Sequence, residues 1–203
     1  MKLYKEFFNR SSVEVAKDLL GKSLFVKFEK SILSGVINET EAYRGLDDDA
    51  CHARKGKTKR CEVMFGPAGY AYVYFTYGMY YMLNFVCEKE DFPSAVLIRS
   101  VIPTRGEDSM AKNSYGQKLE ELSKYNLKNL TNGPGKLTKA FGITKENHNG
   151  VDLEGPEIWL GDKNTNYKDE QIKITPRIGI DYAKKSKNWP WRFYISEEIL
   201  DQK

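Results

Sequence analysis

The stretch from Gly69 to Val86, which reads GYAYVYFTYGMYYMLNFV, restricts the fold of this chain more than any other part of the sequence. Apolar and aromatic residues alternate with period two over Ala71–Thr76 and again over Met79–Phe85, which predicts two β-strands. Tyr77-Gly78 breaks the alternation, and a glycine there predicts a hairpin turn. An apolar hairpin is ordinarily part of a core, but turns lie at the surface. The sequence therefore predicts a hairpin with an exposed tyrosine at its tip.

Three polar groups on this hairpin need an explanation. Tyr72 and Tyr74 share one face of the first strand, because side chains alternate between the two faces of a strand. Asn84 lies among apolar neighbours on the second strand, where a buried amide needs a hydrogen-bond partner.

The remaining sequence mixes strands and helices without regular strand–helix alternation. Ser11 and Glu14 have the spacing of a capping box, which predicts a short amphipathic helix that ends at Gly21. Helices are also expected through Leu119, Leu122 and Leu130 and around 137–141, and further strands over Ser23–Phe28, Gly35–Tyr43, Ser94–Val101, Arg177–Ile180 and Trp191–Tyr194. This pattern predicts a single α+β domain over residues 1–203, with flanking helices on a curved, mixed or antiparallel β-sheet.

The strand Gly35–Tyr43 carries a carboxylate beside an aromatic ring. Alternation places Glu41 and Tyr43 on one face, about 7 Å apart along the strand. The same alternation assigns Ile37 and Glu39 to that face, and Val36, Thr40 and Ala42 to the other. An exposed glutamate on a strand is common, so the pair alone indicates a site corner only weakly.

The loop after this strand combines an acidic run with a basic cluster. Asp47, Asp48 and Asp49 suit the cap of a short helical turn better than a metal site, because aspartate is favoured in first turns. The cations that follow His52, and a second group at 184–192, are typical of solvated loops as well as of DNA contacts. The first group is Arg54, Lys55, Lys57, Lys59 and Arg60, and the second is Lys184, Lys185, Lys187 and Arg192.

Two other features leave alternatives open. Arg99 interrupts an apolar strand, so its guanidinium is either paired with a carboxylate or directed at an anion. The sequence NGPG at 132–135 precedes a helix, which suits a phosphate site or a plain turn.

Composition excludes several classes of protein. The chain has 203 residues, 40% of them apolar, and a net charge of +4, which is compatible with a polyanionic partner without requiring one. Cys51, Cys61 and Cys87 lack the spacing of a disulfide framework or a zinc site, so we expect no metal. The N-terminus has no signal-peptide run and no stretch is long enough to span a bilayer, so we expect a soluble intracellular protein.

In order along the chain, several motifs resemble the alkyladenine DNA glycosylase family. They are NETEAYRG at 38–45, His52, MFGPAGYAYVYFTYGMYYMLN at 64–84, VLIRS at 96–100, NGPGKLTKAF at 132–141, RIGI at 177–180 and WRFYI at 191–195. The resemblance covers nearly the whole chain. Residues 109–130 match no part of the pattern, and the loop after His52 differs from it in length.

The resemblance implies a role for each matching residue. Glu41 is expected to activate the attacking water, and Tyr43, His52 and Tyr74 to stack on a damaged purine. Tyr77 is expected to insert into DNA at the tip of a protruding hairpin, with Met79 and Tyr80 as neighbouring DNA contacts. Asn84 would line the base pocket and exclude purines with an exocyclic amino group. Arg99 would contact a phosphate and the water.

The chemistry implied is hydrolysis of an N-glycosidic bond by a monomer that needs no metal or cofactor and has no lyase activity. Its partner is double-stranded DNA with alkylated or deaminated purines: 3-methyladenine, 7-methylguanine, hypoxanthine or ethenoadenine. Two alternatives remain. A DNA-binding module without catalysis needs no Glu41, and a nucleoside or carbohydrate hydrolase leaves the hairpin tyrosine and the basic loop unexplained.

Overall fold

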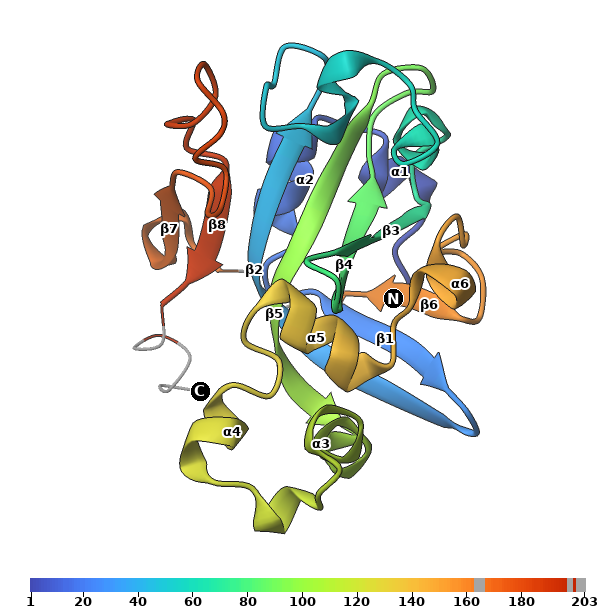
Figure 1. Ribbon diagram of the computed structural model, residues 1–203, viewed down its shortest axis with the longest axis vertical. Coiled ribbons are helices and arrows are strands. Elements are labelled where there is room, and N and C mark those ends of the chain that lie inside the picture. Colours follow the sequence, from blue (N-terminus) through green and yellow to red (C-terminus); the bar gives the residue numbers. More distant parts are fainter. Residues whose placement is uncertain (163–166, 197–198, 200–203) are drawn as a thin grey trace.

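The computed structural model describes residues 1–162, 167–196 and 199 of the chain. Within these residues, eight strands form one open sheet in which every pairing is antiparallel (Figure 1). The main path runs β3-β4-β5-β2-β1-β6, and β8 pairs with both β2 and β7. The strands are β1 (Ser23–Phe28), β2 (Ser31–Arg44), β3 (Ala71–Thr76), β4 (Tyr80–Val86), β5 (Ser94–Arg105), β6 (Ile158–Gly161), β7 (Ile172–Thr175) and β8 (Arg192–Ile195).

The helices are short and surround the long strands. In Figure 1, α2 lies beside the upper part of β5 and α5 beside its lower part. The α-helices are α1 (Lys5–Phe8), α2 (Ser12–Asp18), α3 (Glu107–Tyr115), α4 (Lys124–Lys128), α5 (Pro134–Phe141) and α6 (Lys145–His148). Single 3₁₀ turns cover His52–Lys55, Glu62–Phe65, Leu119–Glu121 and Asp169–Gln171. No helix in the described part of the chain has the length and apolar character that a membrane span requires.

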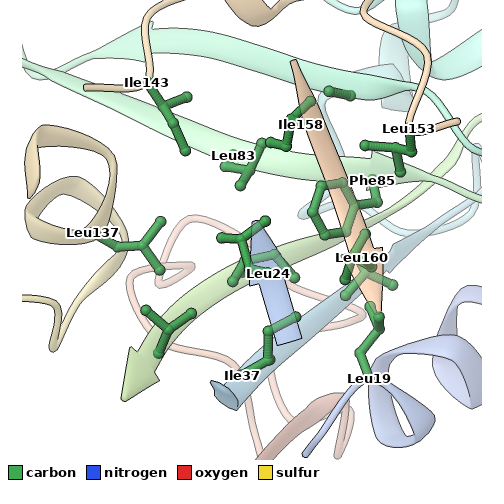
Figure 2. Packing of buried hydrophobic residues seen from close by; sticks show 14 of the residues in the cluster. Leu19, Leu24, Ile37, Leu83, Phe85, Leu137, Ile143, Leu153, Ile158 and Leu160 are labelled. Atoms are coloured by element: carbon green, nitrogen blue, oxygen red, sulfur yellow. The ribbon is translucent and has the colours of Figure 1, made fainter. Parts of the chain in front are cut away.

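One large apolar cluster joins the sheet to its helices. Figure 2 shows Leu19 at the C-cap of α2, Leu24 of β1 and Leu137 of α5 converging on the same interior as the strand residues Ile37, Leu83 and Phe85. Each of these side chains is almost completely buried. Burying one such side chain contributes about 1.5–3 kcal/mol, so this cluster is the main source of stability. Two smaller clusters, around Tyr72 and around Ile180, lie outside it.

The strand β2 changes partner midway. Its first half pairs with β1, and β8 then pairs with it at Glu39–Glu41. On the β5 side, the register shifts between Ile37 and Glu39 and again between Glu39 and Thr40. These irregularities reverse the alternation, so Ile37 lies in the core with Ala42 while Glu41 and Tyr43 lie on the other face. The prediction that Ile37 shares the face of Glu41 is therefore wrong.

Most of the predicted elements are present. The hairpin, the two strands on either side of Lys30 and the strand Ser94–Val101 are confirmed, and the last of these extends to Arg105. The helix near the N-terminus is also confirmed, but its capping box is wrong because Ser11 makes no side-chain cap. Instead, the Ser12 N–H lies 3.3 Å from a carboxylate oxygen of Glu88.

Two predictions about the remaining segments are wrong. Residues 177–180 form a loop rather than a strand, with Gly179 at a φ of +74°. The helix expected through Leu119 and Leu130 is replaced by a 3₁₀ turn and by α4, and α3 was not predicted at all.

Candidate active site

A pocket of about 340 Å³ opens beside the β3–β4 hairpin. The hairpin supplies Tyr72, Tyr74 and Asn84, and the end of β2 supplies Tyr43. Ile178, Ile180 and Tyr182 of the loop at 176–186 form the opposite side. Its size is within the range of pockets that hold small organic groups.

Aromatic side chains dominate the hairpin side of the pocket. His52 packs edge-on against Tyr74, with ring centroids 4.5 Å apart, and its Nδ1 lies 2.9 Å from the Tyr72 hydroxyl. Burial, together with the nearby cations Arg60 and Arg54, lowers the pKa of His52 to about 4. The imidazole is therefore neutral at physiological pH and presents an uncharged aromatic surface.

Glu41 lies directly behind the pocket wall and is fully buried. Its Oε2 accepts a hydrogen bond of 2.8 Å from the Tyr43 hydroxyl, and its Oε1 accepts one of 2.8 Å from the Ile178 N–H. Arg99 Nη1 lies 3.2 Å from the same Oε1. Burial raises the pKa of Glu41, and Arg99, the Ile178 N–H and the Tyr43 hydroxyl oppose this rise. The three neighbours all line the pocket, so the carboxylate is one side chain away from its interior.

Arg99 is paired with carboxylates, the first of the two alternatives left open by the sequence. Its Nε donates to Glu39 Oε1 at 2.8 Å, in addition to the Nη1 contact with Glu41. Arg192 of β8 donates its own Nε to the same Glu39 oxygen at 2.6 Å. Arg192, which ends the second basic stretch of the sequence, thus belongs to an interior ion cluster.

The acidic run at 47–49 anchors the loop at 176–186. Asp48 and Arg177 form a bidentate ion pair with N–O distances of 2.6 and 2.8 Å, and both side chains are fully buried. Asp49 accepts hydrogen bonds from the Ser186 hydroxyl and from the backbone N–H groups of Lys184, Lys185 and Ser186. These bonds, the one from the hydroxyl most of all, lower the pKa of its carboxyl. The run does not cap the 3₁₀ turn His52–Lys55, whose N-cap is Cys51, but Asp48 Oδ1 accepts the Ala50 N–H in the tight turn directly before it.

Arg177 has a second contact that matters for the pocket. Its guanidinium lies 4.6 Å from the centroid of the Tyr43 ring and 5.2 Å from that of Trp191. Asp48 therefore fixes Arg177, and Arg177 fixes both the Tyr43 ring and the adjoining Ile178 N–H. In the described residues, no three histidine, cysteine or acidic side chains are grouped as a metal site.

Asn84 has the partner that its burial requires. Its Nδ2 donates to the backbone oxygens of Tyr72 at 3.1 Å and of Met82 at 3.3 Å. These bonds hold the amide against the pocket, which it lines.

The hairpin tip is exposed and carries backbone strain. Tyr77 is 76% exposed and has a φ of +51°, a region that a bulky L residue rarely adopts. Gly78 follows with a φ of +68°, and the Met79 N–H donates to the Thr76 oxygen to close the turn. Met79 is 65% exposed beside it. Strain of this kind is tolerated where function requires the side chain at that place.

The NGPG segment packs against the start of β4, next to the tip of the hairpin. A Cβ on Gly135 would lie 2.7 Å from the ring of Tyr80, so only glycine permits this close approach. The Gly133 N–H donates to the Arg99 oxygen, and Pro134 lines the pocket. These contacts explain the glycines by packing.

The structure thus brings most of the predicted site residues to one place. Six of them line the pocket and Glu41 lies behind it, whereas Met79 belongs to the hairpin tip and Tyr80 begins β4 beside it. The six are Tyr43, His52, Tyr74, Tyr77, Asn84 and Arg99. Sequence reasoning missed the supporting residues Glu39, Asp48, Arg177 and Ile178. Only Glu39 had a signal, because alternation placed it on the face of Glu41.

Comparison with known proteins gives a consistent result. A family model described as methylpurine-DNA glycosylase matches residues 6–199. A protein of Alkaliphilus oremlandii is 49% identical over 200 residues, covering 97% of this chain and 96% of its own length. A relative in Clostridium novyi is 48% identical and the match covers 97% of this chain and 96% of the relative. A relative in Clostridioides difficile is 42% identical and the match covers 94% of this chain and 98% of the relative. All three carry the provisional name 3-methyladenine DNA glycosylase.

Proposed function

Because the chain belongs to the methylpurine-DNA glycosylase family and is thus a DNA glycosylase of base-excision repair, we propose that its aromatic pocket receives an alkylated purine flipped out of duplex DNA. Glu41 then activates the water that hydrolyses the N-glycosidic bond. A purine inside a duplex is inaccessible, and extruding it costs a few kcal/mol. Contacts between the pocket and the base must therefore offset the free energy that the extrusion costs.

The buried carboxylate of Glu41 is the observation that carries this proposal. A fully buried glutamate is costly unless it is paired and hydrogen-bonded, and three groups of the pocket wall contact it. Burial that raises the pKa of a carboxyl also makes it a stronger base, which suits proton abstraction from water.

Each bond in the reaction can be followed. The C1′–N bond breaks and its electron pair leaves with the purine, which neutralises the positive charge of a base such as 3-methyladenine. The oxygen of water bonds to C1′, and its proton passes to Glu41. Positive charge that develops on the sugar is stabilised by the same carboxylate. Arg99 orients the water in this account, since its guanidinium lines the pocket and contacts Glu41.

Recognition of the base rests on stacking and shape. Tyr43, His52 and Tyr74 offer aromatic faces, each worth about 1–3 kcal/mol when a base stacks on it. Cationic alkylpurines gain further from electron-rich rings. Asn84 lines the pocket and disfavours an exocyclic amino group, so hypoxanthine and ethenoadenine, which lack a free one, are proposed as additional substrates. 3-Methyladenine and 7-methylguanine keep such a group, and the stacking of their cationic rings compensates for it.

The strained tip of the hairpin suits insertion into DNA. Tyr77 is the most exposed of the pocket residues named above and lies in the turn that joins β3 to β4. An aromatic ring there fills the gap that the flipped nucleotide leaves. Basic side chains at 54–60 and 184–187 supply salt-dependent affinity for the phosphates.

Product analysis tests the proposal. The protein is incubated with alkylated duplex DNA, and in parallel with a duplex containing one hypoxanthine, in buffer with a chelator. Free base with strand breaks only after alkali is the expected result, because water rather than a lysine attacks the sugar. Breaks without alkali would contradict the mechanism. Tight binding without release of either base would favour the non-catalytic DNA-binding module.

A further inference from the structure

Glu39 joins two arginines at the back of the pocket. Its Oε1 accepts hydrogen bonds from Arg99 Nε at 2.8 Å and from Arg192 Nε at 2.6 Å. The side chains of Glu39, Arg99 and Arg192 are 12%, 12% and 19% exposed. Charges this far from solvent interact strongly, so their arrangement affects any ionisable group nearby.

Irregular strand pairing produces this cluster. The register of β2 and β5 shifts on both sides of Glu39, which brings Arg99 to the face of Glu39 and Glu41. β8 adds its strand at the same point, with Arg192 paired to Glu41 in the backbone register. A second hydrogen bond fixes the guanidinium of Arg192, because its Nη1 donates to Thr175 Oγ1 of β7 at 3.2 Å.

The cluster limits how Arg99 approaches Glu41. Because its Nε donates to Glu39, Arg99 cannot use the Nε edge of its guanidinium to pair with Glu41, which it contacts through Nη1 at 3.2 Å. An arginine without such a constraint favours a bidentate contact with a carboxylate, through two parallel N–H bonds. A bidentate contact would occupy both Glu41 oxygens and hold the carboxylate in its ionised form.

We propose that Glu39 is a positioning residue that restrains Arg99 to one contact and so keeps Glu41 able to accept the proton of the attacking water. The inference rests on the proposed function, because it assigns a task to Glu39 only if Glu41 is the base. Arg192, whose Nε donates to the same Glu39 oxygen, holds Glu39 in place from the other side.

The charges around Glu41 agree with this role. Glu39 raises the pKa of Glu41, in the same direction as burial, whereas Arg99 lowers it. Other groups also act on Glu41. They are the Tyr43 hydroxyl from β2, Tyr74 from β3, and, from the loop at 176–186, the Ile178 N–H and Arg177, which is paired with Asp48. Removing the negative charge of Glu39 is thus expected to lower the pKa of Glu41, and removing the positive charge of Arg192 to raise it.

Two variants with opposite expected shifts test the inference. The pH dependence of single-turnover excision is measured for Glu39→Gln and Arg192→Gln, and the Glu41 carboxyl is titrated by carbon NMR. In Glu39→Gln the acidic limb should move down by roughly one pH unit, and in Arg192→Gln it should move up. Excision at neutral pH should fall in Glu39→Gln while DNA affinity stays within about threefold. Glu157→Gln, which removes an exposed carboxylate on a distant loop, is the matched control and should shift neither the acidic limb nor the NMR titration of Glu41.

The outcomes separate this inference from the proposed function. If both variants leave the limb and the NMR titration of Glu41 unchanged, or shift them in the same direction, Glu39 is only structural and the inference is overturned. If Glu39→Gln does not fold, the upward shift in Arg192→Gln alone decides. Retained excision in Glu41→Gln would instead reject the proposed function itself.

Discussion

The pocket has one wall from the β3–β4 hairpin and an opposite wall from the loop at 176–186, and different forces hold them. The hairpin wall, comprising Tyr72, Tyr74 and Asn84, is held by a continuous backbone ladder between neighbouring strands. The loop wall, comprising Ile178, Ile180 and Tyr182, has no such ladder. It is held by Asp48 and Asp49, which lie about 130 positions earlier in the chain.

Because different forces hold the two walls, they should differ in how well they tolerate amino-acid substitutions. Ladder hydrogen bonds and apolar contacts are numerous and individually small, so the hairpin wall has no single weak point. The loop wall depends on one fully buried ion pair and a few bonds to Asp49. Removing one member of such a pair leaves an unpaired charge in the interior. The same loop donates the Ile178 N–H to Glu41, so its anchoring also affects the site.

The largest expected effect comes from breaking the loop wall at its anchor. Asp48→Asn leaves Arg177 charged and buried without its carboxylate, which should lower the free energy of unfolding by about 3–5 kcal/mol. Denaturation in urea measures it. Asp47→Asn is the matched control, since that side chain is 94% exposed and the change should stay within about 0.5 kcal/mol. Equal effects of the two variants would mean that the ion pair does not hold the loop.

A smaller effect is expected from protonation of His52, which packs against the hairpin wall. The pKa of His52 is lowered to about 4 in the folded protein. As the pH falls below the ordinary histidine pKa, His52 is therefore protonated in the unfolded chain before it is protonated in the folded protein. Stability should therefore be lost as the pH falls from about 6.5 to 4, by up to about 3 kcal/mol.

The comparison of wild type with His52→Gln isolates this contribution, since His148 is present in both and its pKa is also lowered. Unfolding in urea across that pH range should show a shallower decline in the variant. A decline of equal steepness would show that His52 is not held neutral by the pocket.

The smallest expected effect on stability is at the hairpin tip, where a substitution should change stability and excision in opposite directions. Tyr77→Gly relieves the positive φ and should raise the free energy of unfolding by up to about 1 kcal/mol, while excision falls because the wedge is lost. Tyr77→Ala keeps a Cβ at the same φ, so it should lose excision without the gain. Thermal unfolding and single-turnover excision of both variants provide the check. A loss of stability in Tyr77→Gly would contradict the strain.

The elements that sequence could predict are those set by local pattern. The hairpin follows from period-two alternation around Tyr77-Gly78, and the shared face of Glu41 and Tyr43 follows from the spacing of two residues. Helix α3 could not be predicted because its polar sequence buries only Met110 and Ala111. The bulges near Glu39, which move Ile37 into the core, leave no mark in the alternation.

The loop wall was beyond prediction for a different reason. Residues 177–180 resemble a short strand, but the pairing of Arg177 with Asp48 decides their conformation. That pairing joins residues 129 positions apart, and no local propensity indicates it. The resemblance to a family identified the pocket residues, whereas Glu39, Asp48 and Arg177, which hold them, emerged only from the three-dimensional contacts.

The most direct test of the account measures binding and excision by Glu41→Gln on the same duplex, with one alkylated purine. The substitution keeps the shape of the side chain and its place behind the pocket wall but removes the carboxylate that acts as the base. We predict that the dissociation constant stays within about threefold of wild type while the single-turnover rate falls by about 10²–10⁴-fold. Excision near the wild-type rate, or a loss of binding that accounts for the whole effect, would contradict the assignment of Glu41 as the water-activating base.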